Sequence, residues 1–387
     1  MPKSNCLTKE QRLSLQMDEF MNRRYEFRYN TQIGEVEYRE RFSFQFYFHP
    51  IDKRAQNSIM LDAQSEGIGV WDRDIDRYLH SNRVPIYNPL EEFLFHLPHW
   101  DGKDRIHALA NRVPCKNPHW ELLFHRWFLN MVSHWRGVDK MHANNTSPIL
   151  VGRQGTHKST FCREMIPPAL RAYYTDSIDF SHKRDAELYL NRFALINIDE
   201  FDQITLPQQG FLKHILQKPV VNLRKPHGRS VLELQRYASF IGTSNQKDLL
   251  TDPSGSRRFI CIEVTGNIDT TQPIDYEQLY AQAMHEIHHG ERYWFDSEDE
   301  QIMTENNREF EQTPAMLQLF YQYFKTAQTK EEGEFLTPVE ILNYLKKKSG
   351  MSLSDNKVYH FGRLLQKCGI PSKHTYKGTV YQVIKLS

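Results

Sequence analysis

The sequence predicts an α/β protein. A parallel sheet should form its core, with a small α+β and helical region before it and a winged-helix domain after it. Three short apolar segments, at 147–151, 193–198 and 238–243, have the uncharged composition of buried parallel strands, and polar residues follow each of them. After residue 335 the chain becomes basic, and its pattern changes to helix, turn, helix and hairpin.

The composition is typical of a globular protein. The 387 residues allow two or three domains, and 39% of them are hydrophobic. No apolar run reaches about 18 residues, and the first residues lack an apolar signal core, so we expect no membrane span and a cytoplasmic location. The net charge of +1 means that any binding of nucleic acid must come from local patches. The five cysteines form no Cys-x-x-Cys pair, which argues against a zinc ribbon or a disulfide framework.

Residues 1–88 predict a small α+β region. A helix is expected over 9–23, and a β-hairpin is expected from strands at 25–29 and 36–48. Phenylalanines alternate in the second strand, as in a half-buried strand: Phe42, Phe44, Phe46 and Phe48. Further helices are expected at 52–65, 72–80 and 89–97.

Residues 89–146 predict a helical lead-in to the core, with a helical pattern over 103–136. This segment is rich in tryptophan, at Trp120, Trp127 and Trp135. Packing beneath the sheet is the expected role of these side chains, and it is favoured over stacking on nucleic-acid bases.

A glycine-rich loop follows the strand at 147–151 and ends in Lys158-Ser159. Gly152 and Gly155 allow backbone N–H groups to surround a phosphate, and a helix starting near Thr160 would direct its positive dipole end at the anion. Lys158 should reach the β- and γ-phosphates, and Ser159 should bind Mg²⁺. His157 occupies the position where this motif normally has glycine, so a left-handed backbone there costs about 1 kcal/mol. The expected nucleotide-binding residues are Gly152, Gly155, Thr156, His157, Lys158, Ser159 and Thr160.

The strand at 193–198 ends in two carboxylates, Asp199 and Glu200. Open α/β sheets bind ligands at the carboxyl ends of their strands. We expect Asp199 to hold Mg²⁺ beside Ser159, and Glu200 to polarise an attacking water. The phosphate loop and this acidic strand together predict a site for a nucleoside triphosphate and Mg²⁺.

Three further features carry charge or amide groups. Strand-like residues 220–223 and 231–234 predict a hairpin with a basic tip made of Arg224, Lys225, His227 and Arg229, which suits a phosphate backbone but also an ordinary solvated loop. Asn245 ends the strand at 238–243 and could touch the γ-phosphate or be a simple turn residue. Arg257 and Arg258 follow a Gly-Ser turn, from which either could stabilise transition-state charge across a subunit boundary.

The order of these motifs resembles the virulence-associated E family of phage, plasmid and mobile-element ATPases, which are similar to AAA+ superfamily 3 helicases. The segment YNPLEEFLFHLPHWDGKDRI (87–106) resembles the family's lead-in, and ILVGRQGTHKSTF (149–161) and FIGTSN (240–245) resemble its core. The resemblance implies a P-loop AAA+-like core over 147–265. It also implies Walker A roles for Lys158 and Ser159, Walker B roles for Asp199 and Glu200, a sensor role for Asn245, and an arginine finger at Arg257 or Arg258. Arg236 also falls at a basic position of the family pattern.

Residues 266–330 predict a helical linker, and residues 331–387 predict the winged helix. Residues 335–387 contain nine Lys or Arg residues and two acidic residues, which gives this segment a net charge of about +7. The second helix of this domain carries Lys357 and Arg363, which could enter the major groove of DNA, although many winged helices only pair with other domains.

The sequence therefore predicts an ATP- and Mg²⁺-dependent enzyme that binds single- or double-stranded DNA. We expect a DNA helicase that forms a homo-oligomeric, hexameric ring. An ATP-gated DNA-binding switch of a mobile element, without unwinding, is the main alternative. A DNA-binding adaptor or a metabolic P-loop transferase fits fewer of the motifs.

Overall fold

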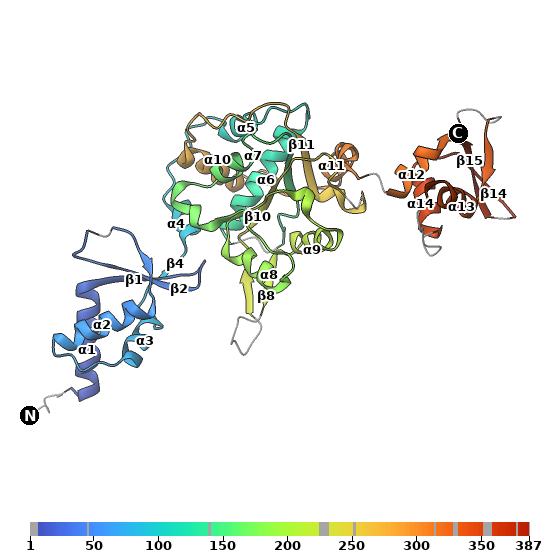
Figure 1. Ribbon diagram of the computed structural model, residues 1–387. Helices are drawn as coiled ribbons and strands as arrows, with labels where there is room; N and C mark the ends of the chain where they lie inside the picture. Colours follow the sequence, from blue (N-terminus) through green and yellow to red (C-terminus); the bar gives the residue numbers. More distant parts are fainter. Residues whose placement is uncertain are drawn as a thin grey trace, which may run out of the picture. The chain divides into compact units, whose positions relative to one another are not determined.

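The structure is a computed structural model of the chain (Figure 1). It describes residues 7–44, 46–137, 141–223, 232–250, 253–312, 315–327, 332–350, 358–376 and 378–386. The chain divides into two compact units. One comprises Met1–Lys247 and Ser254–Arg308, and the other comprises Asp248–Pro253 and Glu309–Ser387. The boundary at 308/309 lies before the start of the expected winged-helix domain at 331.

A five-stranded parallel sheet forms the centre of the first unit. Its strand order is β11 (Phe259–Glu263), β5 (Ser147–Val151), β10 (Ser239–Ser244), β7 (Leu195–Ile198) and β6 (Tyr174–Thr175). Every neighbouring pair runs parallel. The residues of β5, β7 and β10 are all buried, as their lack of charge requires. The predicted mixed α/β fold with a parallel sheet is confirmed, with strand ends shifted by one or two residues.

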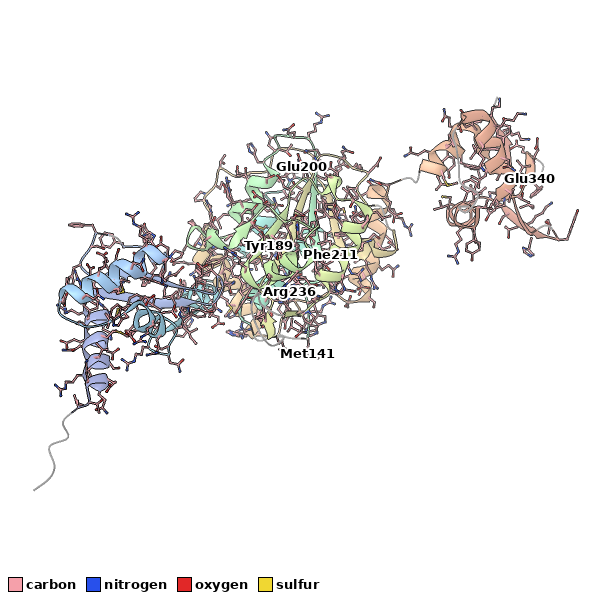
Figure 2. The ribbon with its side chains drawn as sticks, turned by 60° about the horizontal axis from the view of Figure 1, so that its bottom comes forward. Met141, Tyr189, Glu200, Phe211, Arg236 and Glu340 are labelled. Carbon is pink, nitrogen blue, oxygen red and sulfur yellow. The ribbon has the colours of Figure 1, made fainter. Side chains whose placement is uncertain are left out.

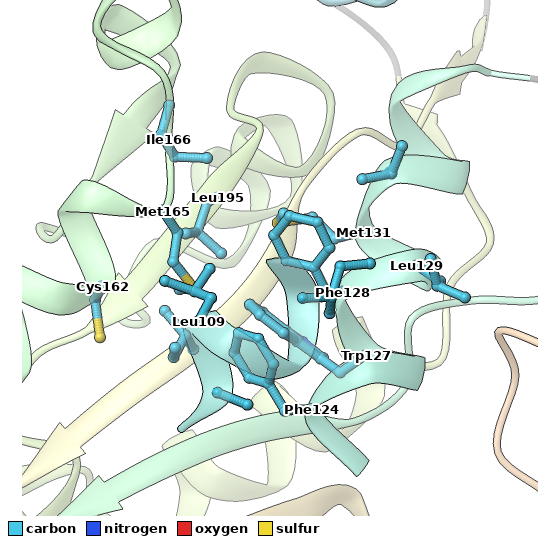
Figure 3. Packing of buried hydrophobic residues seen from close by; sticks show 14 of the residues in the cluster. Leu109, Phe124, Trp127, Phe128, Leu129, Met131, Cys162, Met165, Ile166 and Leu195 are labelled. Carbon is cyan, nitrogen blue, oxygen red and sulfur yellow. The ribbon is translucent and has the colours of Figure 1, made fainter. Parts of the chain in front are cut away.

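Helices pack against this sheet and enclose the main core. They are α4 (Pro89–Phe95), α5 (Arg105–Ala110), α6 (Trp120–Trp135), α7 (Lys158–Glu164), α10 (Tyr276–His288) and α11 (Ser297–Asn307). Two further helices of this unit are α8 (Lys183–Arg192) and α9 (Leu206–Leu216). Aromatic and aliphatic side chains of α6 lie beside Met165 and Leu195 in this core (Figure 3). Trp120, Trp127 and Trp135 are buried in the same cluster, so their expected packing role is confirmed. The single helical pattern predicted over 103–136 is two helices, because Pro114 and Pro118 interrupt it.

The N-terminal part of the first unit is a helix-covered mixed sheet, in which β1 pairs antiparallel with β2 and parallel with β4. Helix α1 (Lys9–Arg24) leads into strand β1 (Tyr25–Asn30), and the sheet order is β3 (His49–Pro50), β2 (Glu35–Glu40), β1 and β4 (Ile86–Tyr87). Helices α2 (Lys53–Ser65) and α3 (Asp72–Leu79) complete a separate hydrophobic cluster.

The predicted second strand of this region, 36–48, is wrong beyond Glu40. Strand β2 ends there because its partner begins at Tyr25, directly after α1, so no neighbouring strand continues the ladder. Phe42, Phe44 and Phe46 are exposed and do not alternate between a buried and a wet face.

A two-stranded antiparallel ribbon leaves the core between α9 and β10. Strands β8 (Val220–Leu223) and β9 (Leu232–Gln235) pair residue by residue, which confirms the hairpin. The tip, residues 224–231, lies outside the described residues.

The second unit contains helices α12 (Ala315–Tyr323), α13 (Pro338–Ser349) and α14 (Val358–Lys367). Its strands are β12 (Phe324–Thr326), β13 (Glu334–Leu336), β14 (Ser372–Thr375) and β15 (Gly378–Lys385). Strand β15 pairs antiparallel with each of the other three. Thr337 and Glu340 form a capping box that starts α13, and Gly350, at φ 68°, ends it. The helix predicted over 314–326 ends at Tyr323, because the next three residues pair with β15.

Candidate functional site

The glycine-rich loop lies between β5 and α7 and is held by neighbouring backbone. A Cβ at Gly152 would lie 3.0 Å from the Val264 carbonyl oxygen, so any larger residue there would have to push this carbonyl away. The Ile268 N–H donates to the Thr156 carbonyl at 3.1 Å, which braces the other end of the loop. Gly155 has φ 83°, and the loop turns there into the helix that begins at Lys158.

Two non-glycine residues in the described part of the chain have positive φ, and both lie at this site. His157 has φ 65° and Glu200 has φ 54°. The expected left-handed backbone at His157 is confirmed. Such conformations cost about 1–3 kcal/mol each and persist where the surrounding structure holds them in place.

The Lys158 ammonium lies inside the loop, and the residue as a whole is 6% exposed. Its Nζ donates to the carbonyls of Gly152 and Arg153, both at 2.8 Å, and to Asn245 Oδ1 at 3.2 Å. Burial lowers the pKa of Lys158, while Asp199 and Asp202 act in the opposite direction. The structure therefore brings together Lys158 and Asn245, which are 87 residues apart.

The predicted metal-binding pair is also brought together. Ser159 Oγ donates to Asp199 Oδ1 at 2.9 Å, and the Thr243 hydroxyl donates to the same oxygen. A serine hydroxyl beside an exposed carboxylate is an all-oxygen donor set that suits Mg²⁺. Glu200 is exposed next to this pair, and its Oε2 accepts from Gln203 Nε2 at 2.7 Å.

Sequence analysis missed Asp202, Thr243 and Ser244. Asp202 Oδ1 accepts from Ser244 Oγ at 2.7 Å and from the Asn245 N–H at 3.3 Å, so Asp202 positions the residue that contacts Lys158. The signal was present as a third acid shortly after Asp199, and as hydroxyl residues at the end of the next strand.

The phosphate loop and the ends of β7 and β10 enclose one pocket of about 300 Å³. Residues 154–160 form one wall, and Asp199, Glu200, Thr243 and Asn245 form the other. Asp199 and Asn245 follow parallel neighbouring strands, so the pocket lies at the carboxyl ends of the sheet, where such sheets bind ligands.

Arg257 and Arg258 do not line this pocket. They end a short 3-10 helix, Pro253–Arg258, before β11. Arg257 Nη1 lies 2.9 Å from Glu300 Oε2 on α11. Their predicted action on a neighbouring subunit remains a prediction.

Most of the predicted nucleic-acid contacts lie outside the described residues: Arg224, Lys225, His227, Arg229 and Lys357. Arg363 is described on α14 and is exposed. It donates to the Tyr359 hydroxyl at 2.9 Å, and its guanidinium carbon lies 4.6 Å from the centre of that exposed ring.

Arg236 joins β9 to β10 and is fully buried in the central part of the chain (Figure 2). Its guanidinium donates to the carbonyls of Leu216 and Lys218, both at 2.8 Å, and to those of Ala238 at 2.9 Å and Asn144 at 3.0 Å. Burial lowers the pKa of Arg236 to about 9. Arg236 therefore joins the base of the β8–β9 hairpin to the C-terminal end of α9.

The fold and the site define an α/β protein of the open parallel-sheet class, with polar residues gathered outside the carboxyl ends of the strands. The model of the virulence-associated protein E-like domain matches residues 94–312, more than half of the 387 residues. The chain belongs to this family. A second model, a domain of unknown function from B. theta, matches residues 313–383.

No curated protein matches the chain. Solved structures of the apo NrS-1 C-terminal region are similar over nearly their whole length. In one comparison the matched region spans 98% of this protein and 100% of the solved chain, with 11% sequence identity and a TM-score of 0.47. In another, the matched region spans 96% of this protein and 99% of the solved chain, with 11% sequence identity and a TM-score of 0.45. Among the described helices, none combines the length and the apolar composition needed to cross a membrane.

Proposed function

We propose that the protein is an ATP-hydrolysing, DNA-binding motor with a P-loop AAA+-like core. It works as a ring, in the manner of the superfamily 3 helicases of phages and mobile elements. The observation that carries this proposal is the convergence of Lys158, Ser159, Asp199 and Asn245 on one pocket at the carboxyl ends of parallel strands.

The loop and the first turn of α7 bind the phosphates of ATP. Backbone N–H groups of 152–160 and the helix N-terminus supply donors, and Lys158 supplies a positive charge already oriented by loop carbonyls. In this proposal Lys158 exchanges its bonds to the protein for bonds to the β- and γ-phosphates.

Ser159 and Asp199 would hold Mg²⁺, which would neutralise phosphate charge when bound. Glu200, exposed beside them, accepts a proton from the attacking water. Asn245 contacts the γ-phosphate or that water, and Asp202 holds its backbone in place.

One of Arg257 and Arg258 acts on the nucleotide of the neighbouring subunit, which makes hydrolysis depend on assembly. If Arg257 is that residue, it must first leave Glu300. A ring built in this way brings the β8–β9 hairpins to a common axis, where the basic residues 224–229 contact the DNA backbone. In this proposal α13, α14 and the antiparallel strands of the C-terminal unit act as a winged helix, which adds contacts through Lys357 and Arg363.

An ATP-gated switch is the second candidate, and the conformation of His157 favours it. A strained residue directly before Lys158 is consistent with slow turnover, so that bound ATP sets an assembly state without driving unwinding.

Measurement of ATP hydrolysis with and without single-stranded DNA tests the proposal, with Lys158→Ala as the blank. We expect turnover that rises with DNA and disappears in the variant. Tight ATP binding without turnover, even with DNA, would support the switch instead. No binding of ATP by the wild-type protein would overturn both candidates.

A further inference from the structure

The segment between β2 and β3 exposes four aromatic side chains. Phe42, Phe44, Phe46 and Tyr47 are 88%, 95%, 72% and 79% exposed, and we call them the aromatic tip. One aromatic side chain buries about 150–250 Å² when it is covered, so four offer roughly 600–1,000 Å². A stable interface takes about 800 Å² from each partner. The tip therefore has the area of a complete binding surface.

The base of this segment is anchored to the C-terminal end of α1. Arg41 Nε donates to the Asn22 carbonyl at 2.7 Å, and the Arg41 N–H donates to the Arg24 carbonyl at 2.9 Å. Arg39 Nη1 donates to the Phe46 carbonyl at 3.0 Å, which ties the far side of the segment back to β2. These bonds project the aromatic rings from a fixed base.

The cations around the tip are already paired, which favours a protein partner over nucleic acid. Arg39 and Arg41 both bind Glu26, at 2.5 and 2.8 Å, and Arg28 binds Glu37 at 2.6 Å. Binding to single-stranded nucleic acid requires cations that are free to neutralise phosphates.

A groove lined by both apolar and charged side chains lies elsewhere on the same N-terminal region. It has a volume of about 740 Å³ and is formed by the first half of α1 together with residues 69–83. Leu13, Met17 and Tyr78 contribute apolar surface, and Trp71 stands 62% exposed at its side. Charged side chains line the rest: Lys9, Glu10, Arg73, Asp74, Arg77 and Arg83. A cavity of about 150 Å³ accepts one benzene ring, so this α1–α3 groove has room for several aromatic side chains.

The tip and the groove are separate surfaces of one chain. The tip is anchored beside Arg24, whereas the groove runs along α1 from Met17 to Lys9. At 1.5 Å per residue, Met17 and Lys9 are roughly 10 and 22 Å along the helix from Arg24. Figure 1 shows the segment after β2 at the end of α1 that joins β1, with the start of α1 at the opposite end.

We propose that the aromatic tip of one copy of this chain docks into the α1–α3 groove of a second copy. Because the two surfaces differ, the contact is head to tail, and each added copy presents a new tip and a new groove. Such contacts build rings when the rotation closes. This interface is independent of the nucleotide chemistry proposed above.

Light scattering and sedimentation of the full chain test the interface. The tip variant is Phe42→Ser/Phe44→Ser, the groove variant is Ser14→Arg/Trp71→Ala, and the control is Phe95→Ser, which removes an equally exposed ring from α4. We expect wild type and control to form species larger than dimers, and each variant to raise the dissociation constant at least about tenfold. A mixture of the two variants should form dimers and nothing larger, because one intact tip meets one intact groove.

Unchanged association in the tip or groove variant, or a wild type that stays monomeric, would overturn the proposal. A tip variant that assembles normally but loses single-stranded DNA would assign the tip to nucleic acid and overturn it too. The Lys158→Ala protein, measured without nucleotide, separates this question from the ATPase. It should assemble through the tip even if hydrolysis is never found.

Discussion

Lys158 and Arg236 are both buried cations of the first unit, and they are held in opposite ways. Lys158 lies against a pocket, where its partners are two loop carbonyls and the side chains of Asn245 and Thr156. Arg236 lies within the core and donates to backbone carbonyls at the end of α9 and in the segments that precede β5, β8 and β10. Burial lowers the pKa of both.

The difference shows that the partners of a buried charge indicate its role better than its burial does. A lysine ammonium has three N–H donors, and those of Lys158 bond to groups that a ligand can replace. Asp199 and Asp202 are close enough to favour its charged form. Arg236 uses its rigid set of donors to satisfy carbonyls that would otherwise be unpaired inside the protein. One cation is available for binding, and the other is part of the framework.

The largest expected effect comes from Lys158→Ala. Loss of the ammonium should reduce ATP turnover at least about a hundredfold, because the transition state gains negative charge at the phosphates. The free energy of unfolding should change by less than about 1 kcal/mol, since no carbonyl of the core depends on this lysine. Steady-state kinetics and urea unfolding measure the two quantities. Lys247→Ala, which removes a partly exposed lysine near the same strand ends, is the matched control.

Arg236→Met should reverse this pattern. It leaves several buried carbonyls without donors, so we expect the free energy of unfolding to fall by roughly 3 kcal/mol. Urea unfolding gives the value, and Arg363→Met, at an exposed position, should change it little. If the Arg236→Met protein were as stable as wild type but had lost ATP binding, Arg236 would have a binding role like that of Lys158 and not a structural one.

Asp202→Ala tests whether the missed carboxylate positions Asn245. Turnover should fall roughly 10–100-fold, as for other groups that orient residues of a site, while ATP affinity should fall less. Kinetics at saturating ATP beside a direct binding measurement separate the two effects. Asp185→Ala, on the exposed side of α8, is the control. Equal losses in binding and turnover would mean that Asp202 supports the whole loop and not Asn245 alone.

The smallest effect is expected at His157. His157→Gly should raise the free energy of unfolding by about 1 kcal/mol or less, because glycine adopts φ 65° without strain. Gly155→Ala, at φ 83°, is the reciprocal variant and should lower it by a similar amount. Thermal melting compares the two. A large rise in turnover in His157→Gly would favour the switch, since it would show that this residue limits hydrolysis.

Short-range patterns made the parallel strands predictable. Residues 147–151 and 195–198 are uncharged over their whole length, and Lys158 and Asp199 follow them at positions that strand geometry alone brings to one edge. The role of Asp202 was not predictable in the same way. It depends on a 3-10 turn, Phe201–Gln203, that brings its carboxylate back to Ser244, 42 residues away.

The error at Phe42–Phe48 has a different cause. Alternating phenylalanines fit a strand, but a strand needs a neighbour, and the neighbour ends where α1 meets β1. The sequence of residues 36–48 alone does not show where the neighbouring strand ends. Similarly, the local pattern of Phe324–Thr326 fits a helix. These residues form a strand because β15, about sixty residues later, pairs with them.

The pairing of β15 also fixes the order in which the second unit can form. Because β12, β13 and β14 have their ladder partner in Gly378–Lys385, the sheet cannot close on the ribosome until that strand has been synthesised and has left the exit tunnel. The first unit has all five strands of its central sheet by Glu263 and can fold well before that moment. A nascent chain therefore carries a completed central sheet while its C-terminal helices still await their last strand.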